Sequence, residues 1–308
     1  MAAAVGVLGA GAMGQLLAMQ LAHQHVPTCL LKRPNTGQQP RQHTLINRNG
    51  QPLCRSLQHH PSDQPLPLQA LLVLTKAQDC EAALSPLLSW LDPAIPIVLL
   101  HNGQGPQQRL LARYPKHNWW WGTLSDGAQR IGACEIHHTG SGLRVAGPAP
   151  TCPWPGSSLP KALHRLGFTL HQDINTALWQ KLTVNAVINP LAARDRITNG
   201  TLLSPIYQGE IGQLCEELAL LGQHLTHTDS ANQIHRRVLA VAKATASNRC
   251  STLQDIDAER ETELACITGC VLTLAKQQGL TLSNHKALLD SLKPQTVDAL
   301  VHSVTRVS

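Results

Sequence analysis

A glycine pattern near the N-terminus constrains the fold of this chain more than any other feature. A G-x-G-x-x-G sequence is formed by Gly9, Ala10, Gly11, Ala12, Met13 and Gly14. It directly follows the apolar run Val5–Leu8 and opens an amphipathic helical pattern that extends to Gln24. Glycines in this context allow a tight strand-to-helix turn and a close approach of the backbone to a pyrophosphate at the helix N-terminus. The pattern therefore predicts a dinucleotide-binding unit in which these six residues contact the cofactor.

Short apolar runs and helical patterns alternate through the first half of the chain, as in parallel strands joined by helices. Further strands are expected at residues 27–32, 70–75, 95–100, 119–124 and 143–146. Residues 34–68 are rich in Pro, Gln and Asn and show little periodicity, so we expect a loop with one short hairpin near Asn49-Gly50. We interpret Trp119-Trp120-Trp121 as a buried strand and not as a surface for stacking nucleic-acid bases.

The second half of the chain has an almost wholly helical pattern. It follows a turn-rich stretch at 151–156, a short helix at 158–165 and a last strand at 168–171. Helices are expected at 175–189, 205–222, 230–246, 258–278 and 284–305, with Gly279 ending the fourth and Pro294 breaking the fifth. The predicted fold is therefore α/β, with an N-terminal Rossmann-type parallel-sheet domain at 1–172 and an all-helical domain at 173–308.

Three polar residues share one face of the first of these helices. Lys181, Asn185 and Asn189 recur every four residues within an otherwise apolar run, which indicates a helix that is buried on most sides. Burying an ammonium and two amides is costly without partners, so we expect a substrate to contact them. In the alternative interpretation Lys181 reaches solvent and the asparagines cap neighbouring segments. Pro190 is expected to kink or end this helix.

The end of the second strand distinguishes between the two nicotinamide cofactors. An acidic residue there accepts a hydrogen bond from the ribose of NAD, whereas a cation accommodates the 2'-phosphate of NADP. This strand ends in Leu31-Lys32-Arg33-Pro34, without an acid, and the Arg33 guanidinium can donate a planar pair of hydrogen bonds to a phosphate. NADP(H) is therefore the predicted cofactor, and the alternative is that Arg33 is a solvated surface residue.

Polar residues follow two other predicted strands. Lys76 comes directly after the strand at 70–75, and Asn102 lies in a glycine-flanked turn after the strand at 95–100. Ligands of open parallel sheets lie beyond the carboxyl ends of the strands, so we predict that both residues contact the cofactor. Lys76 could instead be a solvated residue at a helix start, and Asn102 could serve only the turn.

A carbonyl that accepts a hydride leaves an alkoxide that needs a proton, so the helical domain is expected to supply a proton donor. Lys181 is the predicted acid, because partial burial lowers the pKa of an ammonium from its ordinary value of about 10.4. Glu263 is the carboxylate expected to hold its charge, in a helix-like run whose other acids also fit a solvated face. Asn248 and Ser251 lie at a helix junction and offer donors to a substrate carboxylate, unless both cap helices.

In order and spacing these residues resemble the ketopantoate reductase (2-dehydropantoate 2-reductase) family across nearly the whole chain. Further matching segments are His101–Gly105, Leu178–Leu182, Ile188–Leu191, Asn199-Gly200 and Thr262-Glu263. The resemblance implies NADPH-dependent reduction of 2-dehydropantoate to (R)-pantoate, a cytoplasmic step of pantothenate and coenzyme A synthesis. It also implies that Lys181 is the general acid and that Glu263 engages both Lys181 and the reacting oxygen. The substrate contacts that it implies are Asn185, Asn189, Asn199, Asn248 and Ser251.

The chain departs from the family pattern just beyond Glu263. Family members often have Ile-Asp and then Asn-Gly where this chain has Leu264-Ala265 and Thr268-Gly269. This difference alters the expected far wall of the substrate pocket, so a related 2-oxo acid is a second candidate substrate. The sequence is also compatible with a β-hydroxyacid dehydrogenase or with a non-catalytic NADP(H) sensor.

Composition argues against several other classes. The net charge of +6 is scattered without a run of four basic residues, so nucleic-acid binding is not indicated, and a small anionic substrate is compatible with it. The N-terminus shows neither a signal peptide nor a membrane-spanning helix. We expect a monomer or homodimer that acts on a small 2-oxo acid.

Cysteines and histidines are numerous but do not form a recognisable metal motif. Nine cysteines without a repeated C-x-x-C pattern predict reduced thiols, and Cys266 and Cys270 are interpreted as small buried residues. Several of the 16 histidines are paired in sequence but lack carboxylates or thiolates at matching spacing, so we interpret them as surface or loop residues and expect no metal site. These pairs are His59-His60, His137-His138 and His224 with His227.

Overall fold

The computed structural model describes residues 3–34, 36–152 and 158–292 of the chain. They form two compact units, each with its own core. The first unit comprises the chain up to His101 together with Pro106–Leu178, and the second comprises Asn102–Gly105 and the chain from Trp179 onward. The short segment Asn102–Gly105 is therefore far in sequence from the rest of the unit to which it belongs.

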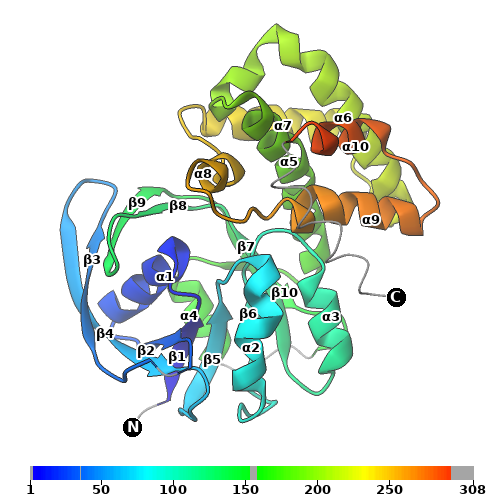
Figure 1. Ribbon diagram of the computed structural model, residues 1–308. Coiled ribbons are helices and arrows are strands. Elements are labelled where there is room, and N and C mark those ends of the chain that lie inside the picture. The colour runs from blue at the N-terminus through cyan, green and yellow to red at the C-terminus, as the bar shows by residue number, and fades with distance from the viewer. Residues whose placement is uncertain (1–2, 35, 153–157, 293–308) are drawn as a thin grey trace. The chain divides into compact units, whose positions relative to one another are not determined.

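The first unit is built on a mostly parallel sheet (Figure 1). In the described residues its strand order is β11-β10-β7-β6-β5-β1-β2-β4-β3-β9-β8. The strands are β1 Ala4–Leu8, β2 Thr28–Lys32, β3 Arg41–Ile46, β4 Pro52–Pro61, β5 Leu68–Val73, β6 Ile97–Leu99, β7 Trp119–Leu124, β8 Gly127–Arg130, β9 Glu135–Gly140, β10 Arg144–Pro148 and β11 Thr169–Leu170. The helices are α1 Ala12–His23, α2 Cys80–Leu88, α3 Pro106–Arg113 and α4 Ser158–Arg165.

The central strands confirm the predicted Rossmann-type arrangement. Strand β1 pairs in parallel with β2 on one side and with β5 on the other, so the carboxyl ends of these strands meet at one edge. Helix α1 follows β1 directly and packs against β2, β4, β8 and β9 (Figure 1). Trp119, Trp120 and Trp121 are all buried in β7, which confirms their interpretation as a core strand.

The expectation of a loop over residues 34–68 was wrong where β3 and β4 lie, whereas the hairpin expected near Asn49-Gly50 is confirmed. Strands β3 and β4 pair in antiparallel fashion around a turn that contains the predicted hairpin residues Asn49-Gly50, and Gly50 has a φ of +77°. Strand β4 also pairs with β2, and β3 with β9. Backbone hydrogen bonds to these neighbours hold the strands in place without apolar periodicity, which is why the hydrophobic pattern did not indicate them.

The interpretation of the histidine pairs as surface or loop residues was also wrong in part, because His59, His60 and His138 are buried. His43 is buried as well, and its ring hydrogen-bonds to the Gln15 side chain at 2.9 Å and to the ring of His59 at 2.9 Å. Burial, followed by the nearby Lys32, lowers the pKa of both His43 and His59 to about 4. These imidazoles are therefore neutral at pH 7 and pack as polar core residues.

The second unit is helical. Its helices are α5 Ile174–Asp195, which begins in the first unit, α6 Pro205–His224, α7 Ala231–Ala244, α8 Ser251–Asp257, α9 Cys270–Gln277 and α10 Ser283–Asp290, with a 3₁₀ segment at Asn199–Leu203 and a π-helical segment at Ala265–Gly269. Helix α6 packs against α7 and α10 (Figure 1). None of the helices in the described part of the chain combines the length and apolarity that a membrane crossing requires.

Two helix boundaries differ from the prediction. Helix α5 continues through Pro190 to Asp195, because burial of Val187, Ile188 and Leu191 against the core outweighs a cost of about 3 kcal/mol for a mid-helix proline. The helix expected at 258–278 does not form over its first part: Glu259 has a φ of +51°, residues 265–269 are π-helical, and α-helix begins only at Cys270.

The sequence also predicted residues that end or break helices. Gly279 ends α9 with a φ of +71°, as predicted. The turn-rich residues 153–156 and Pro294 lie outside the described residues.

Candidate functional site

The glycine-rich turn of the first unit has the geometry that the sequence pattern predicts. Gly9 has a φ of +101°, and a Cβ there would lie 2.6 Å from the backbone of Leu74 and Thr75. A Cβ on Gly14 would overlap the carbonyl oxygen of Gly9. By contrast, a Cβ on Gly11 would meet nothing within 4 Å. The turn is thus closed on the protein side and open at Gly11, beside the N-terminus of α1, where an anionic group can approach the backbone.

The three non-glycine residues of the turn are Ala10, Ala12 and Met13. Ala10 accepts a hydrogen bond at its carbonyl from the Gln15 side chain at 3.0 Å, while Ala12 and Met13 form the first turn of α1 and are half-buried. Gln15 also donates to the carbonyl of Ala133 at 3.2 Å, which ties the turn to the β8–β9 connection. No local sequence pattern indicates this contact, because it joins segments 118 residues apart.

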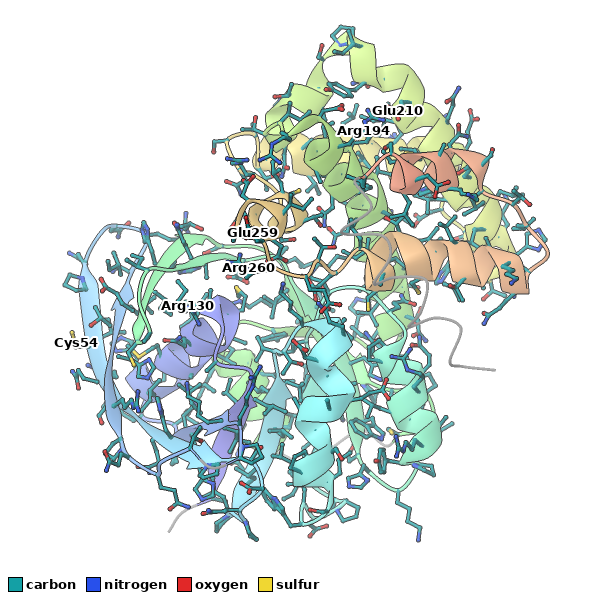
Figure 2. The ribbon with its side chains drawn as sticks, in the orientation of Figure 1. Cys54, Arg130, Arg194, Glu210, Glu259 and Arg260 are labelled. Carbon is teal, nitrogen blue, oxygen red and sulfur yellow. The ribbon has the colours of Figure 1, made fainter. Side chains whose placement is uncertain are left out.

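The predicted cofactor-contact cations follow the two strands that flank β1 in the sheet. Arg33 is exposed immediately after β2, and Lys76 is half-buried close after β5, at the N-terminus of a 3₁₀ turn. Lys32 was not predicted to have a role. Burial lowers the pKa of Lys32, the nearby Cys134 opposes this shift, and the nearby Arg41 and Arg130 lower the pKa further. Several basic groups therefore lie close together near the end of β2. Arg130 ends β8 (Figure 2).

The second unit brings together three of the predicted residues. Lys181 Nζ donates a hydrogen bond to Asn102 Oδ1 at 2.8 Å, and Asn102 Nδ2 donates to Glu263 Oε2 at 2.9 Å. Glu263 is buried, whereas Lys181 and Asn102 are half-buried. The carboxamide therefore bridges the ammonium and the carboxylate, with its oxygen toward the cation and its amide toward the anion. Asn102, which the sequence suggested as a cofactor contact, is joined in this structure to the two predicted catalytic residues.

The other residues of the α5 face lie along the same continuous helix. Asn185 is half-buried one turn after Lys181, and Asn189 is buried one turn further on. The carbonyl of Asn189 accepts a hydrogen bond from the Cys250 thiol at 3.6 Å. Because α5 is uninterrupted through Pro190, the predicted spacing of Lys181, Asn185 and Asn189 on one face is confirmed.

A backbone hydrogen bond joins Asn199 to Asn248. Asn199 N–H donates to the carbonyl of Asn248 at 2.9 Å, and its side-chain amide donates to Thr245 Oγ1 at 2.8 Å. Asn199 is buried, and within the described residues its Oδ1 has no hydrogen-bond partner. This acceptor is therefore available to a ligand group that reaches it.

Asn248 and Ser251 are exposed, and neither is a helix cap. The C-cap of α7 is Thr245, and the N-cap of α8 is Cys250, whose sulfur accepts a hydrogen bond from Leu253 N–H at 3.4 Å. The interpretation in which both residues cap helices is therefore wrong. Cysteine is an unusual residue at this position, so the sequence did not indicate it.

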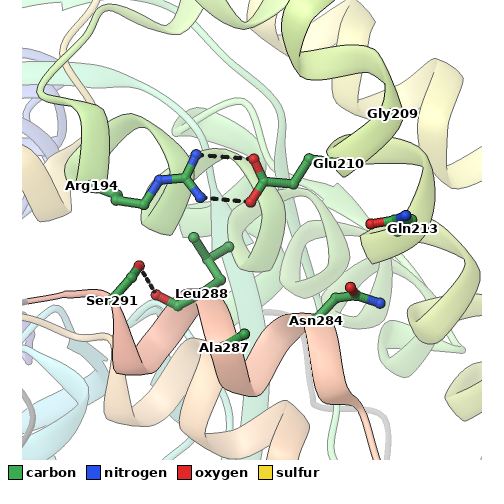
Figure 3. A pocket seen from close by; sticks show the side chains of 8 residues that line it. All are labelled: Arg194, Gly209, Glu210, Gln213, Asn284, Ala287, Leu288 and Ser291. Carbon is green, nitrogen blue, oxygen red and sulfur yellow. Dashed lines mark hydrogen bonds and ion pairs between the residues drawn. The ribbon is translucent and has the colours of Figure 1, made fainter.

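A cavity elsewhere in the second unit involves none of the predicted residues. It has a volume of about 490 Å³ and is lined by Arg194, Gly209, Glu210, Gln213, Asn284, Ala287, Leu288 and Ser291 (Figure 3). Hydrogen bonds to Asp195 and Glu210 raise the pKa of the Arg194 guanidinium, so its charge is already balanced within the protein. In the described part of the chain no group of three or more His, Cys, Asp or Glu residues could hold a metal ion.

Comparison with known families places the chain. Residues 5–151 match the family described as ketopantoate reductase PanE/ApbA, and residues 173–296 match its C-terminal counterpart. The chain belongs to the ketopantoate reductase family. It is 33% identical over 297 residues to 2-dehydropantoate 2-reductase of Yersinia pestis, covering 96% of this chain and 95% of that protein.

Two solved structures show the same fold. A ternary complex of D-mandelate dehydrogenase with NADH and anilino(oxo)acetate has a TM-score of 0.83 at 18% identity, with 96% of this chain and 99% of that chain covered. A dimeric ketopantoate reductase from Staphylococcus aureus has a TM-score of 0.78 at 17% identity, with the same two coverages. The fold is therefore shared with oxidoreductases, and the α/β class with a helical C-terminal region is confirmed.

Proposed function

We propose that this protein catalyses the NADPH-dependent reduction of 2-dehydropantoate to (R)-pantoate. The observation that carries the proposal is the hydrogen-bonded series Lys181–Asn102–Glu263, which combines a proton donor, an orienting amide and a buried carboxylate. Family membership and the 33% identity with a 2-dehydropantoate 2-reductase support the choice of substrate.

Lys181 is the proposed general acid. NADPH, when bound, would supply the hydride that the keto carbon accepts, and the keto oxygen would then need a proton. An ammonium within bonding reach of that oxygen stabilises the negative charge on it and donates the proton. The Asn102 amide fixes the ammonium through one hydrogen bond, and an ammonium carries three donors in all.

Glu263 has two proposed roles. Its carboxylate accepts a hydrogen bond from the Asn102 amide and so orients the Asn102 carbonyl oxygen toward Lys181. Its carboxylate is also proposed to engage the reacting oxygen of the substrate, as the family resemblance implies. Asn185, Asn189, Asn199, Asn248 and Ser251 are the proposed substrate contacts, and the unpartnered Oδ1 of Asn199 is consistent with such a role.

The proposed cofactor preference depends on the charge beyond β2. Gly9, Ala10, Gly11, Ala12, Met13 and Gly14 form the proposed pyrophosphate-binding turn, in which the open side of Gly11 suits an approaching phosphate. Arg33 and Lys76 are proposed to contact NADPH, and the cations Lys32, Arg41 and Arg130 raise the positive charge where a 2'-phosphate would lie.

A substrate panel tests the proposed function directly. NADPH oxidation is followed with 2-dehydropantoate, with two other branched 2-oxo acids and with benzoylformate, the oxo acid that corresponds to mandelate. We expect 2-dehydropantoate to give the highest kcat/KM. Preference for another 2-oxo acid would reassign the substrate, oxidation of a 3-hydroxy acid alone would favour a β-hydroxyacid dehydrogenase, and NADPH binding without turnover would favour a sensor.

The proposed place of the reaction in pantothenate synthesis has its own test. A bacterial strain from which every ketopantoate-reducing enzyme has been removed requires added pantothenate for growth. Expression of this chain is expected to remove that requirement, and expression of Lys181→Ala is expected not to remove it.

A further inference from the structure

The side chain of Asn102 reaches its two partners from a segment distant in sequence. It is separated by 79 residues from Lys181 and by 161 residues from Glu263. Both hydrogen bonds must lie within a few tenths of an ångström of about 2.9 Å to keep their strength. A backbone contact that holds the segment Asn102–Gly105 against the segment bearing Glu263 would therefore determine whether the series forms.

The structure contains such a contact between Gly103-Gln104 and Cys266. The backbone N–H of Gln104 donates to the carbonyl of Cys266 at 2.9 Å. Gly103 has a φ of +74°, and a Cβ on it would overlap the same carbonyl oxygen and lie 2.6 Å from the carbonyl carbon. The two backbones thus approach closely, and only glycine fits at position 103 without displacing one of them.

The same turn holds Glu263. The carbonyl of Glu263 accepts hydrogen bonds from the backbone N–H groups of Cys266 and Ile267, both at 3.0 Å. Cys266 lies in the π-helical segment Ala265–Gly269. π-helices are rare in proteins, and those that occur are often found at functional sites. One short turn therefore fixes the carboxylate-bearing residue and, through the Cys266 carbonyl, the loop that carries Asn102.

We propose that Gly103 is a positioning residue: its close backbone contact with Cys266 sets the Asn102 amide between Lys181 and Glu263. This inference rests on the proposed function for its kinetic consequence, although the contact itself does not. A side chain at position 103 displaces the loop, stretches at least one of the two hydrogen bonds and misplaces the proton donor. A displacement of about 1 Å near reacting groups reduces turnover by roughly 100-fold.

The kinetic test compares two glycines with the same backbone conformation. Gly103 and Gly279 have φ values of +74° and +71°, but a Cβ on Gly279 would meet nothing within 4 Å. Alanine at either position introduces similar backbone strain, and only Gly103→Ala introduces the overlap. We expect Gly103→Ala to lower kcat about 100-fold with little change in the KM for NADPH, and Gly279→Ala to retain kcat.

Asparagine at the same positions separates overlap from strain. Asparagine tolerates positive φ better than alanine, so Gly103→Asn keeps the steric overlap with less backbone strain. This variant can therefore be measured even if Gly103→Ala does not fold. We expect Gly103→Asn to lose activity as Gly103→Ala does, and Gly279→Asn to remain active. Normal kcat in either folded Gly103 variant would overturn the inference while leaving the proposed function intact.

A spectroscopic readout does not depend on activity. In protein labelled with ¹⁵N-asparagine, the side-chain amide signal of Asn102 is assigned by its loss in Asn102→Ala. We expect this signal to shift in Gly103→Ala and Gly103→Asn and to keep its position in Gly279→Ala. An unchanged signal in both Gly103 variants would overturn the positioning role, even if the enzyme proved inactive on every 2-oxo acid tested.

Discussion

The two units position the polar groups of their candidate sites in different ways. In the first unit the glycine-rich turn presents backbone. The close contact of Gly14 with Gly9 is local in the chain, although Gly9 also packs on the backbone of Leu74 and Thr75. In the second unit side chains carry the chemistry, and Asn102, Lys181 and Glu263 come from segments far apart in sequence. A local backbone device can therefore be predicted from a short motif, whereas the side-chain series depends on tertiary packing.

The largest expected effect removes the proton donor of the second unit. Lys181→Ala should reduce kcat by roughly 100 to 10,000-fold, the usual range for a positioned acid. Binding of NADPH should change little, because the glycine-rich turn belongs to the other unit. Steady-state kinetics with 2-dehydropantoate and calorimetry with NADPH provide the two measurements. Near-normal kcat would remove Lys181 from the proposed mechanism.

The next effect distinguishes the two units by their stability in acid. In the first unit the folded-state pKa of His43 and of His59 is about 4, below the ordinary value of 6.5, so the unfolded chain binds more protons between these limits. The stability that depends on the neutral rings is complete above pH 6.5 and is lost as the pH falls toward 4. A shift of this size corresponds to about 3 kcal/mol for one histidine.

In the second unit the corresponding window lies lower. Burial tends to raise the pKa of Glu217, but hydrogen bonds from the His285 side chain and from the backbone N–H groups of Asn284 and His285 lower it to about 2. The stability from this carboxylate is complete above 4.5 and is lost as the pH falls toward 2. Hydrogen exchange followed by mass spectrometry should show loss of protection in the first unit before the second. Loss of both in the same pH range would contradict the assignment.

A smaller effect tests the closed and open sides of the glycine-rich turn. Gly14→Ala places a Cβ against the carbonyl of Gly9 and should destabilise the first unit by about 1–3 kcal/mol. Gly11→Ala meets no protein atom within 4 Å, so it should leave the melting temperature nearly unchanged while weakening NADPH binding. Thermal unfolding and NADPH titration separate the two. Equal melting temperatures for Gly14→Ala and the wild type would show that the turn is less constrained than described.

The smallest predicted effect concerns cofactor choice. Arg33→Asp should raise the KM for NADPH by roughly 10 to 100-fold, because a charge-assisted hydrogen bond contributes about 1.5–3 kcal/mol. The KM for NADH should change much less. Arg48→Asp, which makes the same charge change on the β3–β4 turn, is the control. An unchanged preference in Arg33→Asp would assign the 2'-phosphate to Lys32, Arg41 and Arg130 instead.

The same contrast between the units explains which features the sequence could predict. The G-x-G-x-x-G turn and the face shared by Lys181, Asn185 and Asn189 were predicted because their determinants are local spacings. The hairpin at Asn49-Gly50 was predicted, but the length of its strands β3 and β4 was not, since these strands are held by neighbouring strands and carry few apolar residues.

The bridging position of Asn102 and the helix break before the π-helical segment were also missed. Asn102 meets partners 79 and 161 residues away, and no local pattern encodes that distance. The acidic run that contains Glu263 looked helical because its residues have fair helix propensity, but the positive φ of Glu259 ends the preceding helix. Tertiary contacts decided the conformation at both positions.

The Asn102→Ala variant tests the central claim most directly, because it distinguishes a bridge between Lys181 and Glu263 from a simple cofactor contact. Single-turnover NADPH oxidation with 2-dehydropantoate is measured beside the dissociation constant for NADPH. We predict that the variant loses roughly 100-fold in the rate of the chemical step and binds NADPH nearly as the wild type does. A normal rate in the variant, or a loss confined to NADPH binding, would contradict the account.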